Sequence, residues 1–369
     1  MRILRVSLLV ILVLAALAYG GWRYLGGSVG IAARSLPAIP QRSDALDSLA
    51  DGRSGEIVFA SATPFDFEVL INDTAAAVPT SAMGTLSLPQ DLDAPVPAMV
   101  IVHGSGGISP GREHEYARLL NANGIAALVL DYYTPRGATE DVNYMLRVTS
   151  VTEFDALMDS YRALALLRTH PAIDPARIGI MGFSYGGMVA RFALDDRVHR
   201  ALIGNQPGFA LHVDFYGPCF QDLASPALTG GPILTLRGTA DASNDLVACA
   251  RREQQLRDAG IEVQTHIYEG AGHAWEVNRE RAVSESSPYV SGCEMRYDEA
   301  GRPTVDGRMV VDVPLAAGRP ERFVARMGSG SVLEGCVKYG YMIGRDDSTR
   351  ARADIDLLAF LREKFLLPS

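Results

Sequence analysis

One serine of this chain stands in a setting where its hydroxyl group can act as a nucleophile. Ser184 lies in Gly182-Phe183-Ser184-Tyr185-Gly186, between an apolar run at 177–181 and a helical pattern at 188–194. A strand, a Gly-x-Ser-x-Gly turn and a helix in this order predict a sharp turn that lifts the hydroxyl above the edge of a sheet. The helix N-terminus also adds positive potential where an oxyanion would form. Without these flanks, the same five residues would indicate only a glycine-rich turn.

A serine nucleophile needs a base, and His273 is the best placed of the seven histidines. It lies in the glycine-rich loop 269–275, directly after a predicted strand at 263–268. Such a loop can present an imidazole at the carboxyl end of a parallel sheet, where the serine also lies. We therefore predict that His273 is the base; a solvent-exposed loop histidine is the alternative interpretation.

The acid that orients the base should follow a strand between the serine and the histidine. Asp241 does so, because it comes after the apolar run at 233–236 and Gly238. Asp245 is the alternative acid, and Asp241 could instead cap the helix predicted at 245–259. We predict Asp241, which gives the chain order Ser, Asp, His.

A second glycine-rich segment, His103-Gly104-Ser105-Gly106-Gly107, follows the apolar run at 98–102. The pattern predicts an oxyanion hole made by the backbone N–H groups of Ser105 and Tyr185, with Gly104 or Gly106 as alternatives to Ser105. A phosphate-binding loop is disfavoured because no Gly-Lys-Ser/Thr follows. We expect no metal, since the cysteines form no C-x-x-C pair, and no organic cofactor.

Apolar runs that alternate with helical patterns indicate how these residues are positioned. Runs at 98–102, 125–130, 177–181, 211–215, 233–236 and 263–268 are typical of buried parallel strands, and helices are expected at 113–123, 154–165, 245–259 and 350–365. We therefore predict one α/β domain with a mostly parallel sheet flanked by helices. Residues 56–61, 65–71 and 83–88 are expected to form antiparallel strands that open the sheet.

The segments that carry this pattern resemble the dienelactone hydrolase family of the α/β-hydrolases. The resemblance rests on Val100-Ile101-Val102-His103-Gly104, the segments 131–137 and 174–179, the serine turn, and the Asp241 and His273 loops, which together span roughly residues 98–275. It implies the α/β-hydrolase fold and a hydrolytic triad. The founding enzymes of the family use a cysteine nucleophile, whereas this chain has Ser184, so dienelactone itself is not implied as the substrate.

The segment 274–349 lies outside the family pattern. It is long and rich in glycine, and a hairpin is expected with its turn at 298–301. We predict an insertion that packs beside the active-site end of the sheet.

The N-terminus indicates export. Arg2 and Arg5 precede an uncharged run from Val6 to Trp22, which is typical of a signal peptide cleaved near 16–18 or of an uncleaved membrane anchor. We expect residues 1–24 to be one of these, 25–50 to be a linker, and 51–369 to be the hydrolase domain in an extracytoplasmic compartment. The membrane is then a partner only if the segment is retained.

Cysteine count and charge set two further expectations. Four cysteines in an exported chain favour two disulfides, and the expected strand neighbours pair Cys219 with Cys249, leaving Cys293 with Cys336. The net charge of −9, with no Lys/Arg cluster, excludes nucleic acid as the expected partner.

Taken together, the patterns predict a serine hydrolase that cleaves carboxylic esters or lactones through an acyl-enzyme. An acyltransferase that uses the same site is one alternative. A binding protein that keeps the fold without activity is another, which the presence of Ser184, Asp241 and His273 disfavours.

Overall fold

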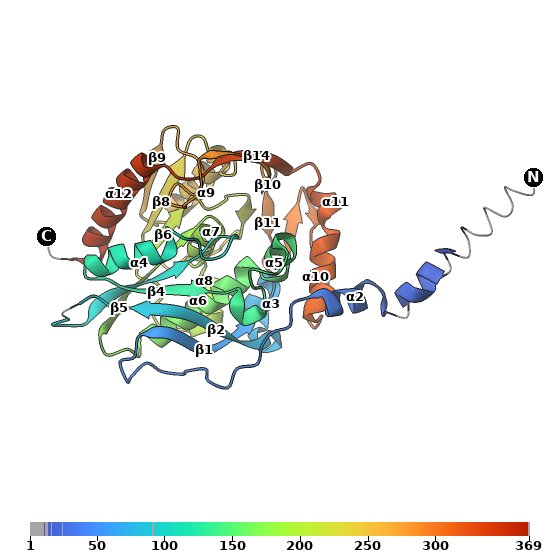
Figure 1. Cartoon of the computed structure of the whole chain (residues 1–369), viewed down its shortest axis with the longest axis horizontal. Helices are drawn as coiled ribbons and strands as arrows, with labels where there is room; N and C mark the ends of the chain where they lie inside the picture. The colour runs from blue at the N-terminus through green and yellow to red at the C-terminus, as the bar shows by residue number, and fades with distance from the viewer. Residues whose placement is uncertain (1–10, 12–13, 16, 24, 91, 368–369) are drawn as a thin grey trace, which may run out of the picture.

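A twisted sheet forms the centre of the computed structural model, which describes residues 11, 14–15, 17–23, 25–90 and 92–367 (Figure 1). The strand order is β1-β2-β4-β3-β5-β6-β8-β9. β1 and β2 are antiparallel to their neighbours, whereas the pairs from β4 to β9 are all parallel. The strands are β1 (Gly55–Thr63), β2 (Val78–Ser87), β3 (Val96–Val102), β4 (Ala126–Asp131), β5 (Ile173–Phe183), β6 (His212–Phe215), β8 (Ile233–Gly238) and β9 (Val263–Tyr268).

Helices cover both faces of this sheet, because the central strands are apolar on both sides. Val100 and Val102 of β3 belong to the core that includes α6 and α7, whereas Met99 and Ile101 belong to the core that includes α4 and α12. Such alternation is the expected consequence of strand geometry. The helices are α3 (Phe67–Asn72), α4 (Glu113–Ala122), α5 (Tyr144–Ser150), α6 (Glu153–Leu167), α7 (Tyr185–Phe192), α8 (Asp196–Ile203), α9 (Leu246–Asp258) and α12 (Asp347–Phe365), with 3-10 turns η1 (Thr74–Ala76) and η2 (Thr134–Arg136).

The predicted fold class is confirmed by this arrangement. Each of the six predicted parallel strands is present, and the four predicted helices correspond to α4, α6, α9 and α12. The antiparallel pairing of β1 with β2 at the edge is also as expected.

The strand expected at 65–71 is wrong, because α3 occupies most of this segment. Phe65 has a φ of 66°, which breaks an extended backbone, and its N–H donates to the buried carboxylate of Asp155 at 2.9 Å. Asp66 then caps the helix by accepting a hydrogen bond from the backbone N–H three residues later. The short apolar–polar alternation was therefore overridden by a capping signal and a tertiary contact.

The segment 274–349 folds into two small sheets and two helices. β10 (Ala282–Val290) pairs with β14 (Val337–Ile343), and β11 (Met295–Tyr297) pairs both with β12 (Pro303–Val305) and with β7 (Gln221–Asp222). The β11–β12 pair is the predicted hairpin around 298–301. The remaining elements are β13 (Arg308–Met309), α10 (Arg319–Gly328) and α11 (Gly330–Leu333).

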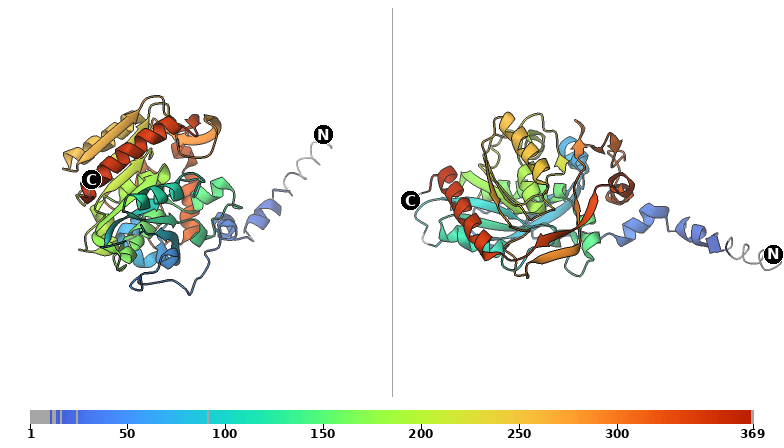
Figure 2. Two further views of the ribbon diagram at one scale, coloured as in Figure 1. Left: turned by 60° about the vertical axis from the view of Figure 1, so that its left-hand side comes forward. Right: turned by 90° about the horizontal axis from the view of Figure 1, so that it is seen from above.

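The N-terminal region has one further helix, α2 (Gly27–Ser35), within the stretch expected to be a linker. α2 lies against α10, and the described residues 17–23 point away from the sheet (Figures 1 and 2). The predicted signal or anchor lies in large part outside the described residues. Among those that are described, no helix combines the length and the apolar character needed to cross a membrane.

Both predicted disulfides are confirmed. Cys219 is bonded to Cys249 with a Cα–Cα distance of 5.0 Å, and Cys293 to Cys336 with a distance of 5.5 Å. The first ties the segment after β6 to the start of α9, because neighbouring parallel strands bring these segments together. The second closes part of the segment 274–349.

Candidate active site

Ser184 occupies a strained turn between β5 and α7. Its φ of 55° and ψ of −116° lie outside the usual regions for a residue with a side chain, a strain of about 1–3 kcal/mol. The turn requires glycine on both sides: a Cβ at Gly182 would lie 2.1 Å from the carbonyl oxygen of Gly186, and one at Gly186 would lie 2.2 Å from that of Val102. The sequence motif therefore folds so that the serine hydroxyl projects from the carboxyl end of the sheet.

The structure brings Ser184, His273 and Asp241 into one hydrogen-bonded chain. His273 Nδ1 lies 2.6 Å from Asp241 Oδ2, and His273 Nε2 lies 2.9 Å from Ser184 Oγ. Because a carboxylate can only accept, Nδ1 carries the proton, and the Nε2 lone pair is left to accept from the serine hydroxyl. The histidine is 5% exposed and the aspartate 2% exposed, so both hydrogen bonds are shielded from water.

Asp241 is held by more than the histidine. Its Oδ1 accepts from both the backbone N–H and the hydroxyl of Ser243, at 3.0 and 2.5 Å. Its Oδ2 also accepts from Asn244 Nδ2 at 3.0 Å. The alternative acid, Asp245, instead caps α9 by accepting backbone N–H groups of its first turn.

The position of His273 is fixed by the segment that follows it in the chain. Its backbone N–H donates to the carbonyl of Met342 at 2.7 Å, which attaches the histidine loop to β14. On another side, the ring of Tyr216 packs against the imidazole with centroids 4.6 Å apart. The hydroxyl of Tyr216 in turn donates to the buried carboxyl of Glu276 at 2.6 Å, and burial raises the pKa of Glu276 to about 7.

The glycine-rich loop after β3 directs its carbonyl groups into the protein. The carbonyl of Gly104 accepts from Gly107 N at 3.0 Å, from His103 Nδ1 at 2.7 Å and from Tyr132 at 3.3 Å, and the carbonyl of Ser105 accepts from the Tyr133 hydroxyl at 3.0 Å. Burial lowers the pKa of His103, so its neutral ring donates through Nδ1. A trans peptide unit directs its N–H opposite to its C=O.

Tyr185, the residue after the serine, is the first residue of α7, where backbone N–H groups lack a partner within the helix. Its side chain is half-buried, and its hydroxyl donates to the carboxylate of Glu153 and accepts from the backbone N–H of Glu153 at 2.8 Å. Arg326 of α10 donates to the same carboxylate at 3.0 Å. The segment 274–349 therefore also contacts the buried surroundings of the serine turn.

A cavity of about 360 Å³ opens above the serine. Its walls come from four places: the glycine-rich loop, α5, the loop after the histidine, and the β10–β14 pair. The lining residues are Gly104, Ser105, Gly106, Ser109, Pro110, Arg112, Tyr144, Ser184, His273, Ala274, Val277, Asn278, Arg279, Ser287, Tyr341 and Ile343. The walls mix hydroxyl, amide, guanidinium and apolar groups, so the cavity suits a small molecule with polar substituents.

Comparison with protein families identifies the chain. The model described as "Dienelactone hydrolase family" matches residues 83–301. The chain belongs to the dienelactone hydrolase family. The family match includes Ser184, Asp241 and His273 and ends before β14. The expectation that the whole segment 274–349 lies outside the family pattern is therefore wrong for residues 274–301. As a member of this family, the protein is a hydrolase that acts on ester bonds.

Individual proteins that resemble this chain have sequence identities of 18–32% to it. A Bradyrhizobium protein named "Probable 2-oxo-3-(5-oxofuran-2-ylidene)propanoate lactonase" is 26% identical over 193 residues, which cover 49% of this chain and 73% of that protein. The quorum-quenching protein AidA of Acinetobacter baumannii is 32% identical over 143 residues, or 38% of this chain and 41% of AidA. Esterase 2 of Thermogutta terrifontis, phosphorylated by paraoxon, aligns with a TM-score of 0.42 and 18% identity over 55% of this chain and 82% of its own.

Sequence reasoning missed several residues of this site. Ser243 and Asn244, which hold Asp241, follow it directly but carry no motif of their own. Tyr144 and Tyr341 line the cavity from segments far from the serine in the chain. A polar pair directly after a candidate acid could have been noted as a source of hydrogen bonds. Nothing in the local sequence around the two tyrosines indicates that they line the cavity.

Proposed function

We propose that this protein is a serine hydrolase that cleaves small carboxylic esters or lactones, with Ser184 as nucleophile, His273 as base and Asp241 as the orienting acid. The observation that carries the proposal is the continuous hydrogen-bonded chain from Asp241 Oδ2 through the imidazole to Ser184 Oγ, at 2.6 and 2.9 Å. Such a chain allows the imidazole to take the serine proton while the carboxylate stabilises the resulting imidazolium.

The reaction follows from this geometry in two halves. Ser184 Oγ attacks the ester carbonyl as its proton moves to His273 Nε2, and a tetrahedral oxyanion forms. Collapse of this intermediate breaks the ester C–O bond; the imidazolium protonates the leaving alkoxide, and the acyl group remains on the serine. Water, deprotonated by the same imidazole, then releases the acid and restores the hydroxyl. With a lactone, the alkoxide stays attached to the acyl group.

We assign the oxyanion hole to the backbone N–H groups of Ser105 and Tyr185. The support for Ser105 is that the peptide carbonyl preceding it, that of Gly104, accepts from the backbone N–H of Gly107, from His103 Nδ1 and from a hydroxyl that Tyr132 shares with the carbonyl of His103. The Ser105 N–H therefore points the opposite way, and a Cβ built on Gly104 would lie 3.3 Å from Ser184 Cβ, so this peptide is next to the nucleophile. One such donor contributes about 3–4 kcal/mol to transition-state stabilisation.

The substrate class is inferred from the cavity and from the relatives. A volume of about 360 Å³ has room for a small acyl group or a lactone ring. The Bradyrhizobium relative is named as a lactonase, which supports lactones among the substrates.

The test is hydrolysis of p-nitrophenyl acetate and of a panel of small lactones by purified protein. Ser184→Ala and His273→Ala should each lower kcat by about 10⁶-fold, and Asp241→Asn by about 10⁴-fold, because triad members act as a unit. Asp245→Asn is the matched control and should retain activity. Wild-type turnover by Ser184→Ala, or a larger loss in Asp245→Asn than in Asp241→Asn, would overturn the assignment.

Two further measurements separate the alternatives. A fluorophosphonate probe should label the wild type at Ser184, which an inactive binding protein would not allow. Added alcohols should change the product only if acyl transfer to an acceptor other than water competes with hydrolysis.

We also propose that the catalytic domain is residues 51–369, with 274–349 as an insertion, and that it works outside the cytoplasm. Two disulfides support an oxidising compartment. Residues 1–24 would be the signal or anchor, and 25–50 the linker. Mass measurement of the mature protein from its native host would reveal whether the first segment is removed.

A further inference from the structure

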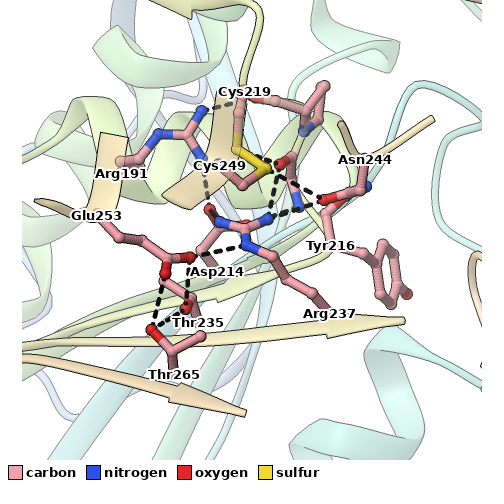
Figure 3. Close-up of polar contacts among 12 residues, drawn as sticks. Arg191, Asp214, Tyr216, Cys219, Thr235, Arg237, Asn244, Cys249, Glu253 and Thr265 are labelled. Carbon is pink, nitrogen blue, oxygen red and sulfur yellow. Dashed lines mark hydrogen bonds and ion pairs between the residues drawn. A yellow bond between two sulfur atoms is a disulfide. The ribbon is translucent and has the colours of Figure 1, made fainter. Parts of the chain in front are cut away.

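We propose that Asn244 is a positioning residue for the triad: its carboxamide, oriented by Arg237, holds the carboxylate of Asp241 in the rotamer that pairs with His273. This inference rests on the proposed function. Asn244 lies beside the guanidinium of Arg237 and close to the Cys219–Cys249 disulfide (Figure 3). Its side chain also contacts Asp241, which the figure does not label. Neither its position in the chain nor the family motifs assign it a role.

The orientation of the Asn244 amide is determined by its three partners. Its Oδ1 accepts from Arg237 at 2.8 Å, and a guanidinium has only donors to offer. Its Nδ2 donates to Asp241 Oδ2 at 3.0 Å and to the backbone carbonyl of Tyr216 at 2.6 Å, both of which can only accept. A flipped amide would therefore place donors against donors and acceptors against acceptors.

The Asn244 amide donates to the same Asp241 oxygen that accepts the hydrogen bond from His273. Asp241 Oδ2 accepts from both His273 and Asn244, whereas Oδ1 accepts from Ser243. Rotation of the carboxylate about its terminal bond would break the contacts to all of these donors. Asn244 is 2% exposed, so water does not compete for its hydrogen bonds.

Arg237 is itself anchored on several sides. It donates to Glu253 of α9 at 2.9 Å, to Asp214 of β6 at 3.1 Å and to the carbonyl of Gly217 at 3.0 Å. The Cys219–Cys249 bond joins the segment that contains this carbonyl to α9. The amide of Asn244 is therefore fixed relative to β6, β8 and α9 together (Figure 3).

A residue that positions the acid should affect the chemical step more than substrate binding. Asn244 does not line the cavity, so its loss should leave KM within about two-fold of the wild type. Asn244→Ala removes one donor to Asp241 Oδ2 and should lower kcat about 10- to 100-fold, the range found when a side chain that hydrogen-bonds a metal-ligating residue is removed.

Asn244→Asp keeps the shape but replaces the Nδ2 donor by a second carboxylate oxygen. Two carboxylates at about 3 Å cannot both ionise freely, so they share a proton at neutral pH. The charged groups facing this pair are His273 and Arg237, and Tyr341 lies nearby. We expect the acid limb of kcat/KM to move to lower pH, because the shared proton reduces the negative charge on Asp241 that favours the protonated imidazole.

The experiment compares Asn244→Ala, Asn244→Asp and the matched control Thr235→Val with the wild type. Thr235 is equally buried and donates to Glu253 at 2.9 Å, so its loss weakens the same network without touching Asp241. Steady-state hydrolysis of p-nitrophenyl acetate is followed from pH 5 to 9, and rates are expressed per site titrated with a fluorophosphonate. A destabilised variant is thus still measured through its folded fraction.

The expected result is a loss of kcat in both Asn244 variants, a displaced acid limb in Asn244→Asp, and wild-type kcat in Thr235→Val. Wild-type kcat and an unmoved profile in the Asn244 variants would overturn the inference, as would an equal loss of kcat in Thr235→Val. If Ser184→Ala is inactive in the same assay, such a result leaves the proposed function standing; if Ser184→Ala is active, the proposed function itself fails.

Discussion

Glu276 gives the protein a pH-dependent stability that one substitution should remove. Its carboxyl group is 1% exposed and lies behind the His273 loop, where it accepts a hydrogen bond from Tyr216 at 2.6 Å. Burial raises its pKa from 4.5 to about 7, and the Tyr216 hydroxyl and the Arg112 guanidinium oppose this only in part. Glu276→Gln keeps the shape and the acceptor for Tyr216 but cannot ionise.

The sign and size of the effect follow from linkage. Because the folded protein binds the Glu276 proton more tightly than the unfolded chain, this stabilisation is present below pH 4.5 and is lost as the pH rises through about 7. Each pKa unit corresponds to about 1.4 kcal/mol, so the loss amounts to about 3 kcal/mol by pH 8. The Gln variant should lack this loss.

Urea unfolding of the wild type and of Glu276→Gln between pH 4.5 and 8 measures how the free energy of unfolding of each protein depends on pH. The free energy of unfolding of Glu276→Gln, relative to the wild type, should increase by about 3 kcal/mol across the range. Glu269→Gln, at an exposed position, is the control and should show no such trend. A constant difference between Glu276→Gln and the wild type at all pH values would refute the reasoning.

Three further predictions test the surroundings of the site. Replacing Cys219 and Cys249 by Ala should lower the free energy of unfolding by about 3–4 kcal/mol, since it frees a loop with a sequence separation of 30; an unchanged urea midpoint would contradict this. Arg326→Met leaves the buried Glu153 carboxylate without its cation and should cost about 3–5 kcal/mol in the same assay, most of which Glu153→Gln should restore in the double variant. Tyr341→Ala should widen the cavity and raise kcat/KM for naphthyl acetate relative to p-nitrophenyl acetate; an unchanged ratio would exclude this wall from substrate selection.

The sheet and its serine turn could be predicted because their signals are local. Fully apolar runs are typical of strands buried on both faces, and these became β3, β4, β5, β6, β8 and β9. The glycines at 182 and 186 are required by close backbone approach, which a sequence motif records directly. The pairing of Cys219 with Cys249 followed from strand order alone.

Contacts between distant segments could not be predicted in this way. Arg326 and Glu153 form an ion pair across a separation of 173 residues, and nothing in either local sequence indicates the other. Asn244 is close to Asp241 in the chain, but its orientation depends on Arg237, whose own fixed position depends on β6 and α9. The α3 error has the same origin, because a distant carboxylate fixes Phe65.

Residues inside and outside the family match contribute different parts of the site. The family match ends at residue 301, and all three proposed triad residues precede that point. Beyond it, β14 supplies the carbonyl of Met342 that fixes the His273 backbone, and it supplies Tyr341 and Ile343 to the cavity wall. The family segment therefore provides the proposed chemistry and most of the cavity wall, whereas β14, outside the match, adds Tyr341 and Ile343 to that wall. Differences in substrate between this protein and its relatives should accordingly depend more on β14 than on the serine turn.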